Sequence, residues 1–348
     1  MFRYIIRRLI QSIPTFFGIT FLTYFIMAMA PGGPAAILAF DPNLPPGERE
    51  RLERRMGLDD PWIIQYFHWL VGDDFRMRDL DGDGEVESWG QRQGILRGDF
   101  GVSFVLGRRP VMDLIGQYVV PTVELTSISL FVGMTFGVLI GILAAVNRGG
   151  LFDNMTRVFA VVFNAVPNFW LGLMLILVFA SWLGWLPTSQ RCSPTASLLR
   201  GGGGCPPIYE RLEYLILPVF TLGTGYIAGY SRYMRTSMLD VIGQDYIRTA
   251  HSKGLSTRTV WMRHGARNAL IPIATFLGPA ITGLIGGAVV IESIYSWPGL
   301  GRQALASINN LDYPFVMATV VISAIATIIG YIISDILYAL IDPRIRFS

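Results

Sequence analysis

The feature that most constrains this chain is the recurrence of long apolar runs that carry almost no charge. Six runs have the length of about 20 residues that a membrane-spanning helix needs. They are predicted at 9–30, 121–146, 158–183, 214–239, 269–295 and 315–341. Only 15% of the 348 residues are charged, whereas a soluble domain carries about 25%. The sequence therefore predicts an all-α, polytopic membrane protein with six transmembrane helices.

The first apolar run also has features of a signal peptide. Arg3, Arg7 and Arg8 precede it, and it ends at Ala28-Met29-Ala30, which is a small-residue pattern like a cleavage site. The run is longer than a typical signal-peptide core, and Pro31 would be the first residue after the cut. We therefore expect an uncleaved first helix.

The distribution of charge predicts the orientation. With the N-terminus inside, basic residues outnumber acidic ones in the inner segments, most densely between residues 232 and 267. The positive-inside rule counts short loops and gives little weight to the long segment after the first helix. We expect a bacterial or archaeal cytoplasmic (inner) membrane protein with both termini in the cytoplasm.

The chain is expected to divide at about residue 115. Residues 1–114 would form the first helix and a long external region with an acidic insertion at about 73–94. Residues 115–348 would form a five-helix core. Within its first helix, Gly133, Gly137 and Gly141 share one face at four-residue spacing, which favours close packing against another membrane helix.

Two sites are predicted in the external segments. The only cysteines, Cys192 and Cys205, share one external loop, so we expect a disulfide in an oxidising compartment rather than two unpaired thiols. The acidic tract has aspartates at positions 1, 3 and 5 of an EF-hand-type loop, but position 12 is Gly90 instead of glutamate. Two interpretations stay open, a weak calcium site and a solvated acidic turn. The candidate calcium ligands are Asp79, Asp81, Asp83, Glu85 and Glu87.

Catalytic patterns are missing from the sequence. The single lysine, Lys253, is followed by glycine, whereas a phosphate-binding P-loop needs lysine followed by serine or threonine. The three histidines, His68, His251 and His264, form no catalytic or metal-binding pattern. We therefore expect that this chain is not an enzyme and that it has neither a catalytic residue nor a cofactor. Any ATPase would be a separate chain.

Three carboxylates fall within the predicted membrane helices. Glu124 and Glu292 lie near outer helix ends, and Asp335 lies toward an inner end. Such groups are costly in a membrane and often functional, so they are candidates for a translocation path or gate. The alternative is a structural contact between helices. None lies at the midplane, where a proton-coupled carrier binds its ions.

The segment 245–263 lies between the fourth and fifth apolar runs and is short, basic and compatible with a helix. It resembles the EAA loop of binding-protein-dependent ABC importers, which forms a coupling helix against the ATPase. Glu-Ala-Ala of that pattern stands here as Arg248-Thr249-Ala250, and the expected glycine is Gly254. These departures are typical of B-type subunits. The expected ATPase-coupling residues are Asp245, Tyr246, Arg248, Thr249, Ala250, Lys253, Gly254 and Arg258.

Further segments at 98–103, 292–301, 312–314 and 342–346 carry the same resemblance. Together they are similar to B-type transmembrane permease subunits of dipeptide and oligopeptide ABC importers. The resemblance implies a type I importer permease fold and half of a translocation pathway. It implies a second, homologous permease subunit (a heterodimer is favoured), two ATPase subunits that use ATP and Mg²⁺, an extracytoplasmic substrate-binding protein and a peptide substrate. No nucleic-acid partner is implied.

Other functions stay open. Related B-type subunits serve nickel and glutathione importers, and no residue that selects the cargo is visible. A secondary transporter or channel is the alternative from another class, although neither has a use for a coupling segment. A sensor or scaffold is a minor alternative, since six spans exceed what it needs.

Overall fold

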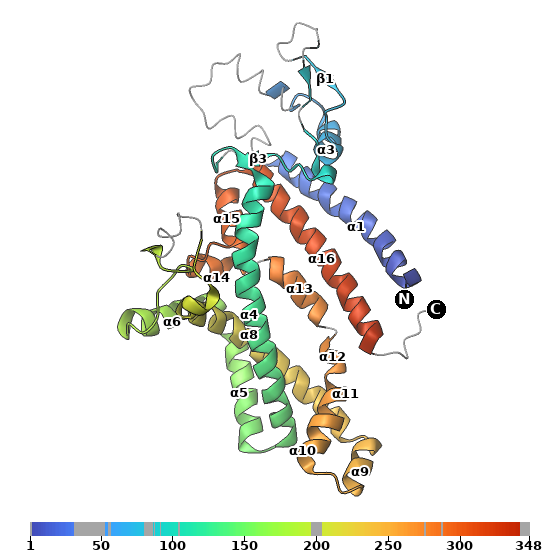
Figure 1. Cartoon of the computed structure of the whole chain (residues 1–348), viewed down its shortest axis with the longest axis vertical. Helices are drawn as coiled ribbons and strands as arrows, with labels where there is room; N and C mark the ends of the chain where they lie inside the picture. The colour runs from blue at the N-terminus through green and yellow to red at the C-terminus, as the bar shows by residue number, and fades with distance from the viewer. Residues whose placement is uncertain are drawn as a thin grey trace. The chain divides into compact units, whose positions relative to one another are not determined.

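Helices make up most of the described part of the chain in this computed structural model (Figure 1). The structure describes residues 2–30, 53–54, 57–79, 86, 88–90, 92–103, 105–195, 204–274, 276–286 and 288–341. Packing divides the chain into two units. Unit 1 contains Met1–Arg8, Val120–Arg302 and Ala326–Ser348, and unit 2 contains Leu9–Val119 and Gln303–Ile325. The boundary at residue 115 stays a prediction.

The long helices match most of the apolar runs. Four helices in the described residues are long and apolar enough to cross a membrane, and a bent helix pair would make a fifth span. The four are α1 (Phe2–Met29), α4 (Val111–Val146), α8 (Leu212–Ile242) and α16 (Tyr313–Ile341). The expectation of a mostly helical membrane protein is confirmed.

The third predicted span is bent instead of straight. It consists of α5 (Leu151–Ala165), α6 (Asn168–Leu175) and the π-helical segment η3 (Ile176–Trp182). The chain bends by 99° between α5 and α6. Proline disfavours the helical conformation of the residue before it, and Val166, which precedes Pro167, is extended with φ −76° and ψ 123°. The prediction of one continuous helix over 158–183 was therefore wrong.

The fifth predicted span, 269–295, is broken into short helices. In chain order these are α11 (Arg267–Ala269), α12 (Ile271–Ala274), α13 (Leu277–Gly286) and α14 (Val289–Ile294). Pro272 and Pro279 lack the N–H group that a helix interior needs, and several glycines add flexibility. Hydropathy alone could not show these breaks.

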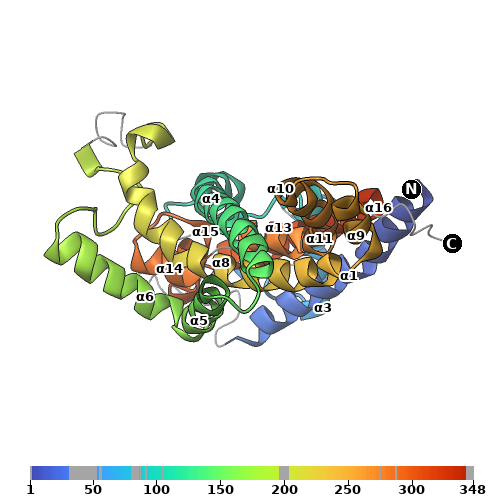
Figure 2. The ribbon, with the colours of Figure 1, turned by 90° about the horizontal axis from the view of Figure 1, so that it is seen from below.

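Helices α4 and α8 form the centre of unit 1. A Cβ atom on Gly137 of α4 would lie 2.7 Å from the Cβ of Tyr230 on α8, and one on Gly141 would lie 2.6 Å from the Cβ of Met234. The close packing predicted from the glycines is confirmed. Gly141 follows Gly137 on α4, and Met234 follows Tyr230 on α8. The contacts therefore advance in the same direction on both helices, so α4 and α8 run parallel. Figure 2 shows α8 passing beside both α4 and α5.

Two buried clusters lie along this pair and involve the segment after α8. Ala269 and Ile273 pack near the C-terminal ends of α4 and α8, with Met234 and Met238. Ile291, Tyr295 and Trp297 pack near the beginnings of the same helices, with Leu125, Leu215, Leu217 and Val219. The broken segment therefore runs back along the whole length of the α4–α8 pair.

Unit 2 is built on aromatic contacts between α1 and α3 (Trp62–Val71). Tyr24 and Tyr66 pack edge to face with ring centroids 5.8 Å apart, and the hydroxyls of Thr20 and Tyr66 are 3.1 Å apart. Two antiparallel ladders, β1–β2 (Met77–Arg78, Ser88–Trp89) and β3–β4 (Val102–Ser103, Arg109–Pro110), stiffen the segment before α4. Three further short elements are η2 (Ile95–Arg97), η4 (Ile208–Glu210, in unit 1) and α15 (Leu300–Asn309), whose first three residues belong to unit 1.

A surface ion pair also holds the segment after α3. The Arg97 guanidinium lies 2.6 Å from the Asp74 carboxylate. A hydrogen bond from Arg97 holds the pKa of Asp74 below its usual value. The same guanidinium donates to the carbonyl of Val71 at 2.8 Å, so it ties the end of α3 to η2.

Candidate functional site

The segment expected to couple to an ATPase folds as a short helix at the end of α8. Helix α9 (Asp245–Ser252) follows a turn at Gly243 and Gln244. The chain then turns through Gly254 into α10 (Thr257–Thr259) and the π-helical segment η5 (Val260–Ala266). Ser256 caps α10 by accepting a hydrogen bond from the Thr259 N–H at 3.3 Å. Figure 1 shows α9 and α10 together at one end of unit 1.

One face of α9 is buried. Ile247 is 2% exposed and Ala250 is 6% exposed, and both pack with Val260 of η5. Two outer contacts support the same arrangement. The rings of His251 and Trp261 lie edge to face at 5.4 Å, and the Asn268 side chain donates to the Tyr246 hydroxyl at 3.0 Å. The helix is thus held against the next segment by side chains.

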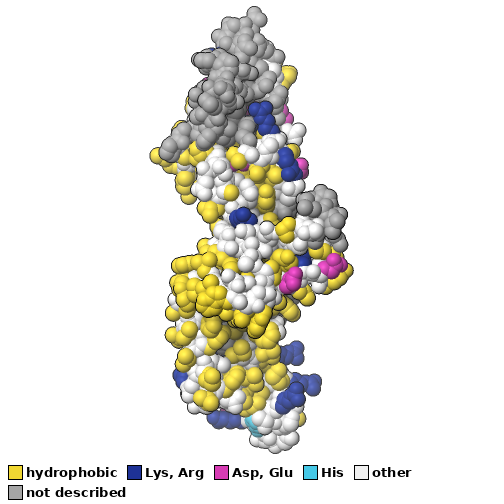
Figure 3. Space-filling view, turned by 90° about the vertical axis from the view of Figure 1, so that its left-hand side faces the viewer, with side chains coloured by type: hydrophobic (Ala, Val, Ile, Leu, Met, Phe, Trp, Pro, Cys, Tyr) yellow, Lys and Arg dark blue, Asp and Glu magenta, His cyan; other side chains and the backbone are white. Residues whose placement is uncertain are grey.

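The other faces of α9 are open. The side chains of Asp245 and Arg248 are 97% and 77% exposed, and their closest charged atoms are 3.8 Å apart. Seven of the eight expected coupling residues are exposed, namely Asp245, Tyr246, Arg248, Thr249, Lys253, Gly254 and Arg258. Ala250 faces inward, so it supports the helix and does not face a partner. Figure 3 shows Lys and Arg side chains gathered at this end of the molecule.

Gly254 has a backbone conformation that suits glycine. Its φ is +75°, in the left-handed region, and an added Cβ would meet no atom within 4 Å. A side chain there would be strained by the backbone and not by crowding. The turn between α9 and α10 therefore depends on this residue.

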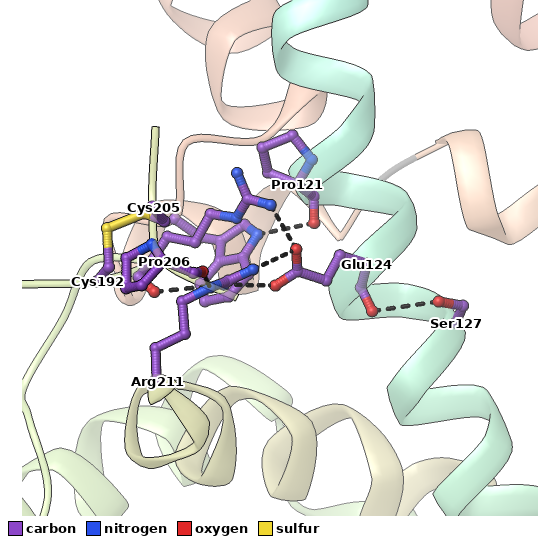
Figure 4. Close-up of polar contacts among 9 residues, drawn as sticks. Pro121, Glu124, Ser127, Cys192, Cys205, Pro206 and Arg211 are labelled. Atoms are coloured by element: carbon purple, nitrogen blue, oxygen red, sulfur yellow. Dashed lines mark hydrogen bonds and ion pairs between the residues drawn. A yellow bond between two sulfur atoms is a disulfide. The ribbon is translucent and has the colours of Figure 1, made fainter. Parts of the chain in front are cut away.

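Glu124 is bound by two arginines beside the disulfide (Figure 4). Arg211 donates to its two carboxylate oxygens at 2.6 and 2.8 Å, and Arg191 forms a further ion pair with it. Arg211 also donates to the carbonyl of Pro206 at 2.8 Å. Glu124 was predicted from the sequence as a candidate, but Arg191 and Arg211 were not, because nothing in their spacing pairs them with a residue on α4.

The structure joins Cys192 and Cys205 by a disulfide, with Cα atoms 5.8 Å apart. Arg191 precedes the first cysteine, and Pro206 follows the second. Both ends of this loop are therefore connected to Glu124, one directly and one through Arg211. The disulfide and the ion cluster hold the same loop against α4.

Glu292 of α14 is fully buried and contacts α4 and the beginning of α15. Thr122 donates to its carboxylate at 2.7 Å, and the Arg302 N–H donates at 2.8 Å. The Thr122 hydroxyl also accepts from the Leu300 N–H at 2.7 Å. A Cβ on Gly301 would lie 3.0 Å from a Glu292 carboxylate oxygen. The carboxylate is thus enclosed by its own chain.

Asp335, the third candidate path or gate residue, pairs with Arg8 of α1 at 3.0 Å. Each of the three carboxylates therefore has basic or hydrogen-bonding groups of this chain around it. This arrangement matches the structural alternative that the sequence left open, and their role in transport stays a proposal.

The possible calcium site falls mostly outside the described residues. Only Asp79 of its five candidate ligands is described. Within the described part of the chain, no group of three or more His, Cys, Asp or Glu side chains is arranged to hold a metal ion.

Comparisons with known proteins establish the family. The chain matches the family described as "Binding-protein-dependent transport system inner membrane component" over residues 137–347. The N-terminal family of the same transport systems matches residues 1–126. The chain belongs to this permease family. The resemblance inferred from the sequence is confirmed, and the protein is a multi-pass inner-membrane permease subunit and not an enzyme.

Two relatives cover the permease from end to end. It is 39% identical over 347 residues to the oligopeptide transport system permease protein AppB of Bacillus subtilis (strain 168), covering 100% of both chains. It is 35% identical over 348 residues to the glutathione transport system permease protein GsiC of Escherichia coli (strain K12), again covering 100% of both.

Proposed function

We propose that this permease forms half of the translocation pathway of an ATP-driven importer for dipeptides or oligopeptides. The observation that carries the proposal is the geometry of α9, which has one face buried against η5 and polar, basic faces open to a partner. AppB, which matches this chain over its whole length, is named an oligopeptide transport system permease protein, and this similarity supports a peptide cargo. The relative GsiC makes glutathione the nearest alternative, and nickel is a further one.

The open faces of α9 are the proposed contact with an ATPase subunit. A partner that moves α9 would also move η5, because Ile247, Ala250 and Val260 pack as one cluster. Trp261 packs on the same cluster, and the neighbouring residues Ala266 and Ala269 pack against Met238 of α8. A displacement at α9 would therefore reach both α8 and the broken segment after it.

Six crossings of the membrane fit the path of the chain. Helices α4 and α8 run parallel, so the bent pair between them must return once across the membrane. The broken segment from α11 to α14 returns along the same pair after α8. Thr126 of α4 donates to the carbonyl of Leu284 at 3.0 Å, which satisfies a backbone group in that segment, as a membrane requires. Together with α1 and α16, we therefore propose six spans, with α9 and both termini on the cytoplasmic side.

The proposed assembly contains a second, homologous permease subunit, two ATPase subunits and an extracytoplasmic substrate-binding protein. ATP and Mg²⁺ would bind the ATPase chains. The external acidic tract with Asp81 and Asp83 is proposed as a weak Ca²⁺ site with a structural role, apart from transport itself. Glu124, Glu292 and Asp335 would position helices that line the path.

Uptake by proteoliposomes that contain all four kinds of subunit tests the function. We expect uptake of a labelled oligopeptide to require ATP and to persist after ionophores have collapsed every ion gradient. Competition with unlabelled glutathione and Ni²⁺ separates the three cargoes. Uptake that follows an ion gradient without ATP would identify a secondary transporter instead.

A further inference from the structure

A pocket of about 280 Å³ lies between α4, α5 and α8, near the end of unit 1 that carries α9. Its small and apolar lining residues are Ala144, Ala160 and Val161. Its polar lining residues are Thr156, Arg157, Ser231, Arg232, Arg235 and Thr236. Three arginines and no acidic residue line it, which is unusual beside apolar membrane helices.

One of these arginines is already neutralised. Arg235 binds the Asp153 carboxylate with two hydrogen bonds of 2.5 and 2.8 Å, and Asp153 is 1% exposed. The N–H of Gly149 donates to the same carboxylate at 2.9 Å. This pair fixes the end of α5 against α8 and forms one wall of the pocket.

The other two arginines leave an excess of positive charge. Arg157 hydrogen-bonds to the uncharged side chain of Asn154. Arg232 is exposed, and its side chain makes no ion pair with any described residue. Three guanidinium groups line the pocket, and one of them, that of Arg235, is bonded to the Asp153 carboxylate. Among the described residues, no carboxylate forms an ion pair with the other two, so two positive charges at this pocket are not paired. An anion would complete the site.

The hydroxyl groups around the pocket already donate hydrogen bonds and are not available to an anion. Thr156, Ser231 and Thr236 each donate to a backbone carbonyl of their own helix, at 2.9, 3.2 and 3.1 Å. The donors available to an anion are therefore the guanidinium groups of Arg157 and Arg232. Guanidinium groups bind phosphate oxygens well because their planar N–H groups match that geometry.

The surface next to the pocket is apolar. On α5, Leu151, Met155, Val158 and Val161 are 63–77% exposed. Figure 3 shows the hydrophobic side chains that gather on the face over α5 and α6. A ligand that fills the pocket and covers this face needs an anionic group joined to long apolar chains.

We propose that the pocket binds the phosphate of an anionic phospholipid, with Arg157 and Arg232 as its donors and with acyl chains along α5. The Asp153–Arg235 pair positions the two helices that carry these donors. Basic pockets between membrane helices bind such headgroups in other proteins. This inference is independent of the proposed cargo and of the coupling role of α9.

Native mass spectrometry of the purified full-length permease with its co-purifying subunits, in a neutral detergent, tests this proposal. Phosphatidylglycerol and phosphatidylcholine with identical acyl chains are the two probes. We expect phosphatidylglycerol to bind and phosphatidylcholine not to be retained. Arg157→Gln and Arg232→Gln should each lower phosphatidylglycerol affinity about fivefold, since one basic residue near a membrane surface contributes about 1 kcal/mol.

Arg148→Gln is the matched control. Arg148 is exposed in the turn between α4 and α5 and does not line the pocket, so its loss should leave specific binding unchanged. Arg157→Lys and Arg232→Lys keep the charge and should retain most of the affinity, and they distinguish lost binding from misfolding. Equal retention of both lipids would overturn the proposal, as would equal effects of all three Gln variants. Displacement of the lipid by equimolar inorganic phosphate, or by a peptide with a free carboxylate, would also overturn it.

Discussion

Ile247 of α9 packs against Val260 of η5, across the turn that contains Gly254. This contact fixes α9 to the segment that follows it, in addition to the turn that joins the two along the chain. The polar side of α9 is left open, so the helix has both a rigid support and a free surface. A coupling element needs both features, because a loosely held helix would absorb a displacement instead of passing it on.

The turn itself is tested by two substitutions of Gly254. Gly254→Leu should strain the left-handed backbone by about 1–2 kcal/mol and reduce peptide uptake per ATP hydrolysed, while the protein still reaches the membrane. Gly254→Asn is the control, because asparagine tolerates this conformation better. The two rates are measured on the same proteoliposomes. Unchanged coupling and ATPase co-purification in the Leu variant would contradict the assignment.

Thr122 is fully buried and is expected to stabilise the fold through its hydrogen bonds to α14 and α15. Thr122→Val removes a donor to Glu292 and an acceptor for the Leu300 N–H. Leaving such buried groups unsatisfied costs about 1–3 kcal/mol, so the melting temperature in detergent should fall by several degrees. Ser127→Ala, five residues along α4, loses only a bond to the carbonyl of Glu124 in its own helix and should change little. Equal melting temperatures for the two variants would count against the Glu292 network.

The disulfide can be checked directly on protein made in its native host. Mass spectrometry without reduction should detect a peptide that links Cys192 to Cys205. Closing a loop with a sequence separation of 13 residues stabilises a protein by about 3 kcal/mol. A reductant should therefore lower the melting temperature of the wild type and leave a Cys192→Ser, Cys205→Ser double variant unaffected. Two free thiols that react with an alkylating reagent would refute the bond.

Calcium binding by the acidic tract is expected to be weak. A loop that lacks its terminal glutamate should bind Ca²⁺ in the range of about 10⁻⁴–10⁻³ M. Calcium titration of the intact transporter should show a signal that Asp81→Ala and Asp83→Ala each weaken. Asp59→Ala changes an exposed carboxylate outside the tract and should keep the signal. If all three variants respond to calcium in the same way, the acidic tract is a solvated turn and not a calcium site.

Much of the fold could be predicted from hydropathy, because a membrane span must be long and apolar. The breaks could be located only partly. Pro167 and Pro272 mark two of them, but a proline inside an apolar run can also kink a helix without ending it. Whether Val166 would become extended depends on the helices around it, which the local sequence does not describe.

The site was predictable only where it is continuous in the sequence. The coupling segment could be identified as one stretch, and its helix and Gly254 turn are present. The contacts of Glu124 and Glu292 join residues that are 87 and 170 positions apart in the chain. A single sequence contains no signal for such pairs, so Arg211 and Thr122 could not be predicted. The inward position of Ala250 also required the structure, since it depends on Val260.

Cross-linking from α9 shows whether its open face contacts an ATPase subunit. Because the two native cysteines are bonded to each other, a cysteine introduced at Arg248 or Lys253 is the only free thiol of the permease. In membranes that contain the whole transporter, a thiol-specific cross-linker should join either variant to an ATPase subunit. Tyr209→Cys, also highly exposed but in η4, should give no such product. If maleimide labels Arg248→Cys and Lys253→Cys but neither variant is linked to the ATPase, α9 is not the contact with that subunit.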